Sequence, residues 1–151
     1  MIYQEKGEME KTKQILEEIY HANSAPSGVK SIASLRLAAI LMESDNKLEA
    51  IEIYRNINNN KSYDRYIREL AALLGAKTLV IIDDKSKAEE TKATLNKIEA
   101  ESTLLKYYIS EQKGIFAMKQ NDLESAKKIF EEISKNPESS ETLKQRSGEM
   151  L

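Results

Sequence analysis

One group of residue types recurs in this chain every 38 residues, and that interval limits the folds that the chain can adopt. A small residue occupies positions 12, 50, 88 and 126, which are Thr12, Ala50, Ala88 and Ala126. A residue type that often ends helices lies five positions before each of them: Gly7, Asp45, Asp83 and Asn121. An aliphatic residue lies seven positions after each of them: Ile19, Ile57, Leu95 and Ile133. A fixed interval of roughly 20 to 50 residues is typical of proteins built by stacking one supersecondary unit on the next.

A further set of small residues keeps the same interval, at Ala38, Ala76 and Gly114. Each lies in an apolar segment with the 3.6-residue spacing of a helix, just before one of the turns. Two helices can approach to about 8 Å only where the side chains between them are small. We therefore expect these residues to lie where the two helices of a repeat cross.

The clearest copy of the pattern spans residues 114–137. It combines a small residue, a polar turn, an alanine, an aromatic residue and a closing proline: Gly114, Asn121, Asp122, Ala126, Phe130 and Pro137. This copy resembles the tetratricopeptide repeat. The resemblance implies an all-α fold, a right-handed α-solenoid of antiparallel helix pairs with a C-terminal capping helix. Tetratricopeptide units are usually about 34 residues long, so each unit here would carry roughly one extra helical turn.

The resemblance covers nearly the whole chain and predicts a single domain over 1–151. We expect a partial first repeat at 1–23, repeats at about 29–61, 62–100 and 102–136, and a capping helix at 139–151. The first copy is cut short, because the residues before Gly7 can supply only the end of a helix. The third copy departs most, since Thr91 and Lys92 replace an aliphatic and an aromatic residue. We therefore expect its second helix to be rotated or longer than its neighbours.

Composition excludes several classes of function. The 23 basic and 25 acidic residues are interspersed and give a formal net charge of −2, which is not the basic footprint of a nucleic-acid-binding protein. The absence of cysteine rules out disulfides and thiolate metal sites. No apolar run approaches the length of about 18 residues that marks a membrane-spanning helix, so we expect that this chain itself does not span a membrane.

Few residues have the chemistry of a catalytic or metal site. His21, the only histidine, has no nucleophile or second acid near it in the sequence and is interpreted as a surface residue. The pair Asp83-Asp84 coincides with a turn of the repeat and is followed by lysines, which oppose cation binding. Neighbouring glutamates such as Glu17-Glu18 point about 100° apart on a helix and do not converge on one substrate. We therefore predict no catalytic residue, no metal and no cofactor, and a protein that is not an enzyme.

The resemblance also implies where a partner would bind. In tetratricopeptide proteins the first helix of each repeat lines a concave groove that holds a peptide or a partner helix. By register, the positions that would line this groove are mostly apolar: Ile32, Leu35, Arg36, Ala39, Met42, Leu70, Leu73, Lys77, Val80, Tyr108, Glu111, Ile115 and Met118. An apolar groove bordered by Tyr, Met and Arg suits a hydrophobic peptide or protein partner. The alternative is that superhelical curvature or the terminal helix buries these side chains.

The segment 31–41 carries a narrower resemblance. Its sequence S-I-A-S-L-R-L-A-A-I-L, followed by Asp45-Asn46 and Ala50, is similar to the periplasm-facing tetratricopeptide domain of a membrane-anchored, ancillary SecYEG translocon subunit of proteobacteria. That resemblance implies a role in protein export or chaperoning at the bacterial inner membrane, with the cytoplasm as the alternative location. Because the chain begins inside a repeat, we expect an upstream segment, such as a membrane anchor, in the natural protein.

A second hypothesis is self-assembly. The truncated first repeat would leave apolar surface at the N-terminal edge, and such surface drives association. In that case a second copy of the chain would fill the groove or cover the edge, and the protein would form a homo-dimer.

Overall fold

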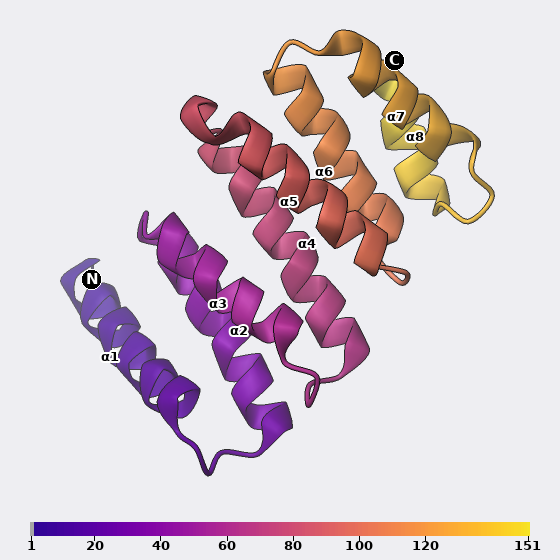
Figure 1. The fold of residues 1–151 in the computed structure, drawn as a ribbon. Helices are drawn as coiled ribbons and strands as arrows, with labels where there is room; N and C mark the ends of the chain where they lie inside the picture. The colour runs from indigo at the N-terminus through magenta and orange to yellow at the C-terminus, as the bar shows by residue number, and fades with distance from the viewer. Residues whose placement is uncertain (1) are drawn as a thin grey trace. The chain divides into compact units, whose positions relative to one another are not determined.

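The fold is all-helical, as predicted. The computed structural model describes residues 2–151, with side chains from residue 5 onward, and within them it contains eight α-helices, one 3-10 helix and no strand (Figure 1). The helices are α1 (Ile2–His21), α2 (Ser27–Glu43), α3 (Lys47–Asn59), α4 (Arg65–Ile82), η1 (Lys85–Lys87), α5 (Ala88–Glu101), α6 (Lys106–Lys119), α7 (Leu123–Lys135) and α8 (Glu141–Glu149).

Helices that follow one another in the chain pack together. Direct packing joins α1 to α2, α2 to α3, α5 to α6, α6 to α7 and α7 to α8. The chain divides into two compact units, residues 1–75 and residues 76–151, and the boundary falls inside α4. These sequence-adjacent pairs give the fold a helical, repeat-like character.

Three of the predicted turns share one backbone conformation. Asp45, Asp83 and Asn121 have φ angles of 65°, 47° and 61°, in the left-handed region that Asn and Asp tolerate better than most residues. After α2, the Asn46 N–H donates to the Leu41 carbonyl at 2.8 Å, and after α6 the Asp122 N–H donates to the Ala117 carbonyl at 2.9 Å. These bonds satisfy carbonyls that would otherwise lack a partner at the helix end. The 38-residue interval therefore predicted the ends of α2, α4 and α6 correctly.

The turn expected at Gly7 is wrong. Gly7 lies inside α1, which runs without a break from Ile2 to His21. No glycine among the described residues has a positive φ. A single glycine in a helix costs only about 1 kcal/mol relative to alanine, and here it is flanked by residues that favour helix. Gly7 therefore does not end a helix as Asp45 does.

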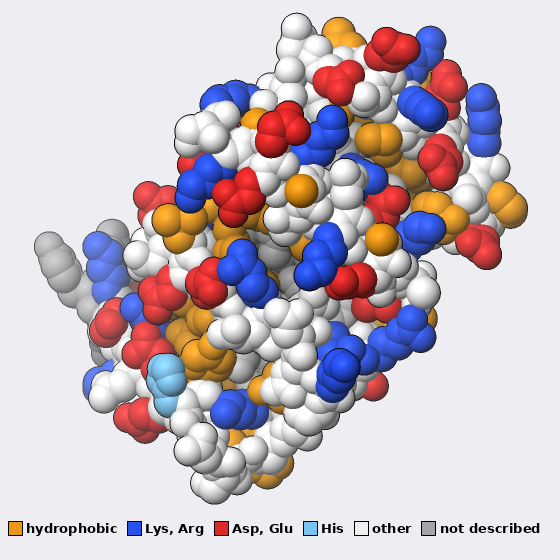
Figure 2. Space-filling model, in the orientation of Figure 1, with side chains coloured by type: hydrophobic (Ala, Val, Ile, Leu, Met, Phe, Trp, Pro, Cys, Tyr) orange, Lys and Arg blue, Asp and Glu red, His pale blue; other side chains and the backbone are white. Residues whose placement is uncertain are grey.

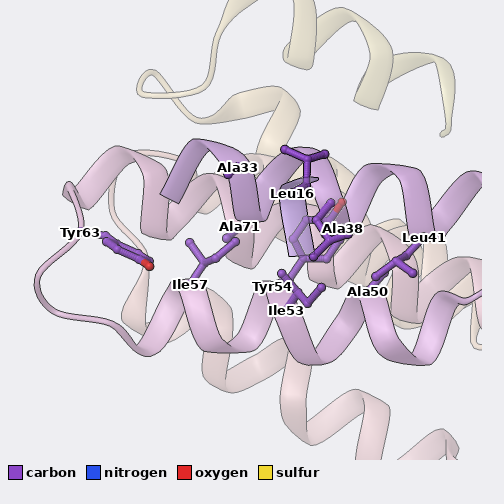
Figure 3. Packing of buried hydrophobic residues seen from close by; sticks show 11 residues of the cluster. Leu16, Ala33, Ala38, Leu41, Ala50, Ile53, Tyr54, Ile57, Tyr63 and Ala71 are labelled. Carbon is purple, nitrogen blue, oxygen red and sulfur yellow. The ribbon is translucent and has the colours of Figure 1, made fainter. Parts of the chain in front are cut away.

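The core of the first unit is built from α1, α2, α3 and the beginning of α4 (Figure 3). Ala38 of α2 and Ala50 of α3 are both fully buried, which confirms that small residues of the repeat lie where helices pack. Large side chains surround them: Leu16, Leu37, Leu41, Ile53, Tyr54, Ile57 and Tyr63. Each such buried aliphatic side chain contributes about 1.5–3 kcal/mol relative to an exposed one.

The second unit has two neighbouring clusters of buried side chains. Ala76 and Val80 of α4 pack with Leu95 of α5 and Phe116 of α6. The other cluster joins α6, α7 and α8 through Ala117, Ala126, Phe130, Ile133 and Leu143. Leu143 is fully buried, so the predicted C-terminal helix is present and covers the side of the α6–α7 pair. Gly114 lies directly against the ring of Phe130, as expected for a small residue at a helix crossing.

Candidate partner-binding site

One face of α2 carries an exposed, partly apolar stripe. Val29, Ile32, Arg36 and Ala39 are exposed and lie three or four residues apart, so they share one side of the helix. The opposite side of α2 packs into the core through Leu37, Ala38 and Leu41. Three of the predicted groove residues, Ile32, Arg36 and Ala39, are thus accessible to a partner.

A shallow hollow of about 600 Å³ lies beside this stripe, between α1 and α2. Its wall is formed by Glu5, Glu8, Met9, Thr12, Arg36, Ala39, Ile40 and Glu43. Three glutamates and one arginine give this wall a net negative charge, and Met9, Ala39 and Ile40 contribute apolar surface. The face shown in Figure 2 carries interspersed acidic and basic side chains with hydrophobic groups between them.

The other predicted groove residues of the first unit are less accessible. Leu35, Met42 and Leu70 are half-buried, and Leu35 and Met42 pack against the core. Leu73 is buried. Side chains of this kind stabilise the unit, and a partner could reach them only at their edges.

In the second unit, α8 contacts two of the predicted groove residues. Glu111, of which only 7% is exposed, accepts hydrogen bonds from Nε and Nη2 of Arg146, the latter at 2.7 Å. The Tyr108 hydroxyl lies 3.1 Å from Oγ of Ser140, the residue that caps α8. The alternative that we considered for the groove positions was contact with the terminal helix. This contact occurs at Tyr108 and Glu111.

The remaining predicted positions of this unit differ in exposure. Val80 is buried and Ile115 is half-buried, and both pack into the clusters of this unit. Lys77 and Met118 are exposed. The structure does not bring the six positions of this unit together as one accessible surface.

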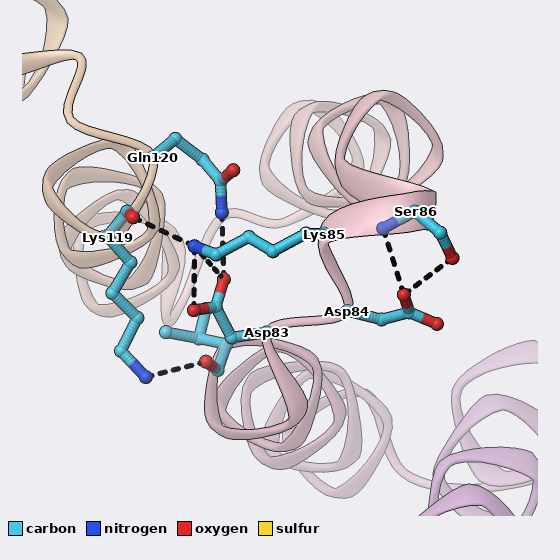
Figure 4. Close-up of polar contacts among 7 residues, drawn as sticks. Asp83, Asp84, Lys85, Ser86, Lys119 and Gln120 are labelled. Atoms are coloured by element: carbon cyan, nitrogen blue, oxygen red, sulfur yellow. Dashed lines mark hydrogen bonds and ion pairs between the residues drawn. The ribbon is translucent and has the colours of Figure 1, made fainter.

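The carboxylate of Asp83 is held by the second unit's own donors (Figure 4). Its Oδ2 lies 2.8 Å from Nζ of Lys85, and its Oδ1 accepts a hydrogen bond from Nε2 of Gln120 at 2.8 Å. Lys85 also donates to the Lys119 carbonyl at 2.9 Å. The hydrogen bond from Lys85 is the main reason why the pKa of Asp83 is lowered from 3.8. Asp83 thus links the end of α4 to the end of α6.

Asp84 has a different local role. Its Oδ1 accepts hydrogen bonds from the Ser86 hydroxyl at 2.6 Å and the Ser86 N–H at 3.0 Å, which lowers the pKa of Asp84. Asp84 thereby caps η1. Within the described residues, no group of three or more His, Asp or Glu side chains is placed to hold a metal ion.

His21 is exposed at the end of α1, and its ring meets the ring of Tyr20 edge-on at 4.9 Å between centroids. This is the surface position expected from the sequence.

Sequence reasoning missed a pocket between α5, α6 and α7. Lys92 lies in its wall, and the replacement of an aromatic residue by Lys92 was the feature that could have indicated it. That replacement instead led us to expect a rotated or longer helix. α5 has 14 residues, against 13 in each of α3 and α7, and η1 precedes it.

No family model, no curated protein and no solved structure matches this chain. The geometry defines an all-helical protein of repeat-like character. Among the residues that the structure describes, no helix combines the length and the apolar character needed to cross a lipid bilayer.

Proposed function

We propose that this chain is a non-catalytic scaffold that binds a peptide or a segment of a partner protein on the first helices of its repeats. The main support is the exposed stripe of α2 next to a hollow whose wall includes Arg36 and Ala39. In this proposal the helix pairs form a right-handed solenoid of the tetratricopeptide kind. The shared turn conformation of Asp45, Asp83 and Asn121 supports regular repetition.

The chemistry of the hollow favours a particular kind of ligand. Its wall combines the apolar side chains of Met9 and Ile40 with the acidic side chains of Glu5, Glu8 and Glu43. A thioether side chain adapts to ligands of different shape, and acidic groups at a rim attract basic partners. The proposed ligand is therefore an amphipathic segment with apolar residues and at least one lysine or arginine. A role in export at the inner membrane rests on the sequence resemblance alone.

The proposal is tested with peptides selected against the purified chain from a display library of short random sequences. Ile32→Glu should weaken the affinity for the selected peptides by roughly tenfold or more, which corresponds to a loss of about 1.4 kcal/mol in binding free energy. Leu48→Glu is the matched control, because Leu48 is also an exposed aliphatic residue, 69% accessible, but lies on α3. Affinity is measured by fluorescence anisotropy, and circular dichroism checks the fold. Equal affinity of both variants, or selected peptides without apolar and basic residues, would contradict the proposal.

Self-assembly is the second candidate, and the exposed side chain of Ile15 on α1 favours it. Ile15 is 57% exposed, and exposed apolar surface drives association. Sedimentation equilibrium should then give a dimer that Ile15→Glu dissociates. A monomer at all concentrations would exclude this candidate and leave the scaffold proposal in place.

A further inference from the structure

The second unit contains a pocket of about 340 Å³ between α5, α6 and α7. Its apolar floor is formed by Leu95, Phe116 and Ala117, which are all buried. Polar groups surround the mouth. The complete wall comprises Ala88, Glu89, Lys92, Leu95, Asn96, Lys113, Phe116, Ala117, Gln120, Asp122, Ser125 and Ile129.

The 38-residue repeat explains why no aromatic side chain of the chain itself fills this pocket. Positions 54, 92 and 130 are equivalent, because each lies four residues after its small residue at 50, 88 or 126. Tyr54 and Phe130 are 4% and 1% exposed, and their rings are part of the cores. Lys92 is exposed instead. A lysine keeps its ammonium in water, so the third copy lacks the ring that its counterparts bury.

A second replacement acts in the same place. A Cβ atom added at Gly75 would lie 3.3 Å from Cβ of Tyr54. Gly75 corresponds to Lys113 in the next copy, 38 positions later. Nζ of Lys113 lies 2.7 Å from a carboxylate oxygen of Glu99 on α5. This ion pair holds the lysine at the wall of the pocket and leaves the apolar floor uncovered.

The charges around the mouth favour a ligand without negative charge. Lys113 is neutralised by Glu99. Hydrogen bonds from Ser125, and to a smaller extent the charge of Lys92, lower the pKa of Asp122, which is therefore ionised at neutral pH. Glu89 adds a second carboxylate against the single unpaired charge of Lys92. The net negative charge of the rim would repel an anion, whereas it would not repel a neutral aromatic ring or a phenol.

We propose that this pocket binds the aromatic side chain of a phenylalanine or tyrosine from a partner polypeptide. The partner would supply the ring that the third copy lacks. A cavity of about 150 Å³ is enough to hold benzene in a protein core, so a pocket of about 340 Å³ accepts such a ring together with the first atoms of its backbone. Naming a polypeptide as the source of the ring rests on the proposed function, but the pocket belongs to the second unit, whereas the α2 stripe belongs to the first.

The experiment uses p-cresol, the side-chain analogue of tyrosine, with the whole chain and no partner. Titration is followed by NMR of the methyl groups of Leu95, Ala117 and Ile129, which line the pocket. We expect saturable shifts of these methyls with a dissociation constant of roughly 1 mM, the range of a small, efficient ligand. Nuclear Overhauser contacts between the cresol ring and the same methyls should appear.

Lys92→Phe restores the ring of the repeat and should abolish these shifts, because the pocket is then filled from within. Lys97→Phe is the matched control, since Lys97 is an exposed lysine of α5 outside the wall, and it should leave the shifts unchanged. Shifts that are absent from the wild-type chain, or that persist in Lys92→Phe, would overturn the proposal. If Lys92→Phe does not fold, the Overhauser contacts in the wild-type chain decide. Because no partner is present, failure here leaves the peptide test of Ile32→Glu intact.

Discussion

Gly114 packs closely against the ring of Phe130 in the second unit. A Cβ atom added there would lie 2.7 Å from Cζ of Phe130, and the ring is fully buried between helices. Gly114→Ala should therefore lower the free energy of unfolding by about 1–3 kcal/mol, the usual cost of overpacking a core. Urea denaturation monitored by circular dichroism measures this change.

Gly148 is the matched control for that substitution. It lies in α8, and a Cβ atom added there would have no neighbour within 4 Å. Gly148→Ala should leave the chain equally stable or stabilise it by up to about 1 kcal/mol, because alanine favours helix over glycine. Equal effects of the two substitutions would contradict the packing described at Gly114.

Asp83 makes stability depend on pH. Its pKa is lowered in the folded state, mainly by the hydrogen bond from Lys85. A carboxyl with a lowered pKa stabilises the fold above its unfolded pKa, near 3.8, and this contribution is lost as the pH falls through the folded pKa. Asparagine tolerates the same left-handed turn and does not titrate. The Asp83→Asn variant should therefore lose less stability than the wild type between pH 6 and about pH 2. Thermal melts across this range test the difference, and parallel curves would contradict it.

Single residues also show what the sequence can and cannot predict. Turns were predicted at Asp45, Asp83 and Asn121 because the residue type and the 38-residue interval agree. The left-handed conformation that these residues adopt depends on local backbone chemistry. Gly7 occupies the equivalent position of the 38-residue interval but lies inside α1 and does not adopt the left-handed conformation. The bond from Lys119 Nζ to the Val80 carbonyl, at 2.8 Å, joins residues 39 apart. No local pattern predicts such a contact, because it depends on how the helices pack.

At the scale of the element, the contacts that hold α8 include the Arg146–Glu111 ion pair and the buried side chain of Leu143. Arg146→Met should cost about 1–3 kcal/mol, since it leaves the buried Glu111 carboxylate without its donors. The double variant Glu111→Gln with Arg146→Met should lose less than the sum of the two single losses, because the two side chains interact directly. A double-mutant cycle by urea denaturation measures this coupling.

The control for this cycle is Lys144→Met. Lys144 pairs with Glu141 on the same helix, at 2.8 Å, but 91% of the Glu141 side chain is exposed. Exposed pairs contribute about 0–1 kcal/mol, so this substitution should have little effect. Additive effects in the Arg146 cycle would mean that the pair does not secure α8.

The helices themselves follow from the sequence more readily than their contacts do. Apolar spacing and turn residues predicted helix over most of the described chain, including the C-terminal helix. Arg146 and Glu111 lie 35 residues apart, and nothing in their local sequence marks them as a pair. The groove prediction placed Glu111 on an open surface and kept burial by the terminal helix as the alternative, and α8 contacts α6 through this pair.

At the scale of the whole molecule, contacts cluster within two units that meet inside α4. Leu37 is buried in the first unit and Ile133 in the second. Replacing either with alanine should cost about 2–5 kcal/mol. In repeat proteins a change acts mostly on its own unit and its nearest neighbours. Hydrogen exchange should therefore accelerate most in α2 and α3 for Leu37→Ala, and most in α6 and α7 for Ile133→Ala.

The two variants serve as controls for each other. Equal acceleration along the whole chain in both would show that the molecule opens as one cooperative body. The boundary between the units could not be predicted from sequence, because the helical pattern of α4 continues through Gly75 and Ala76 without a linker. The repeat interval predicts successive helices, whereas the density of contacts between them depends on side chains distant in sequence.

The shared turn conformation also bears on how such a chain could lengthen. Residues 46–83 begin just after one left-handed aspartate and end at another, with φ angles of 65° at Asp45 and 47° at Asp83. If this segment were duplicated in tandem, the junction between the copies would reproduce a connection that the chain already makes. Growth by whole 38-residue blocks would then require no newly evolved connector.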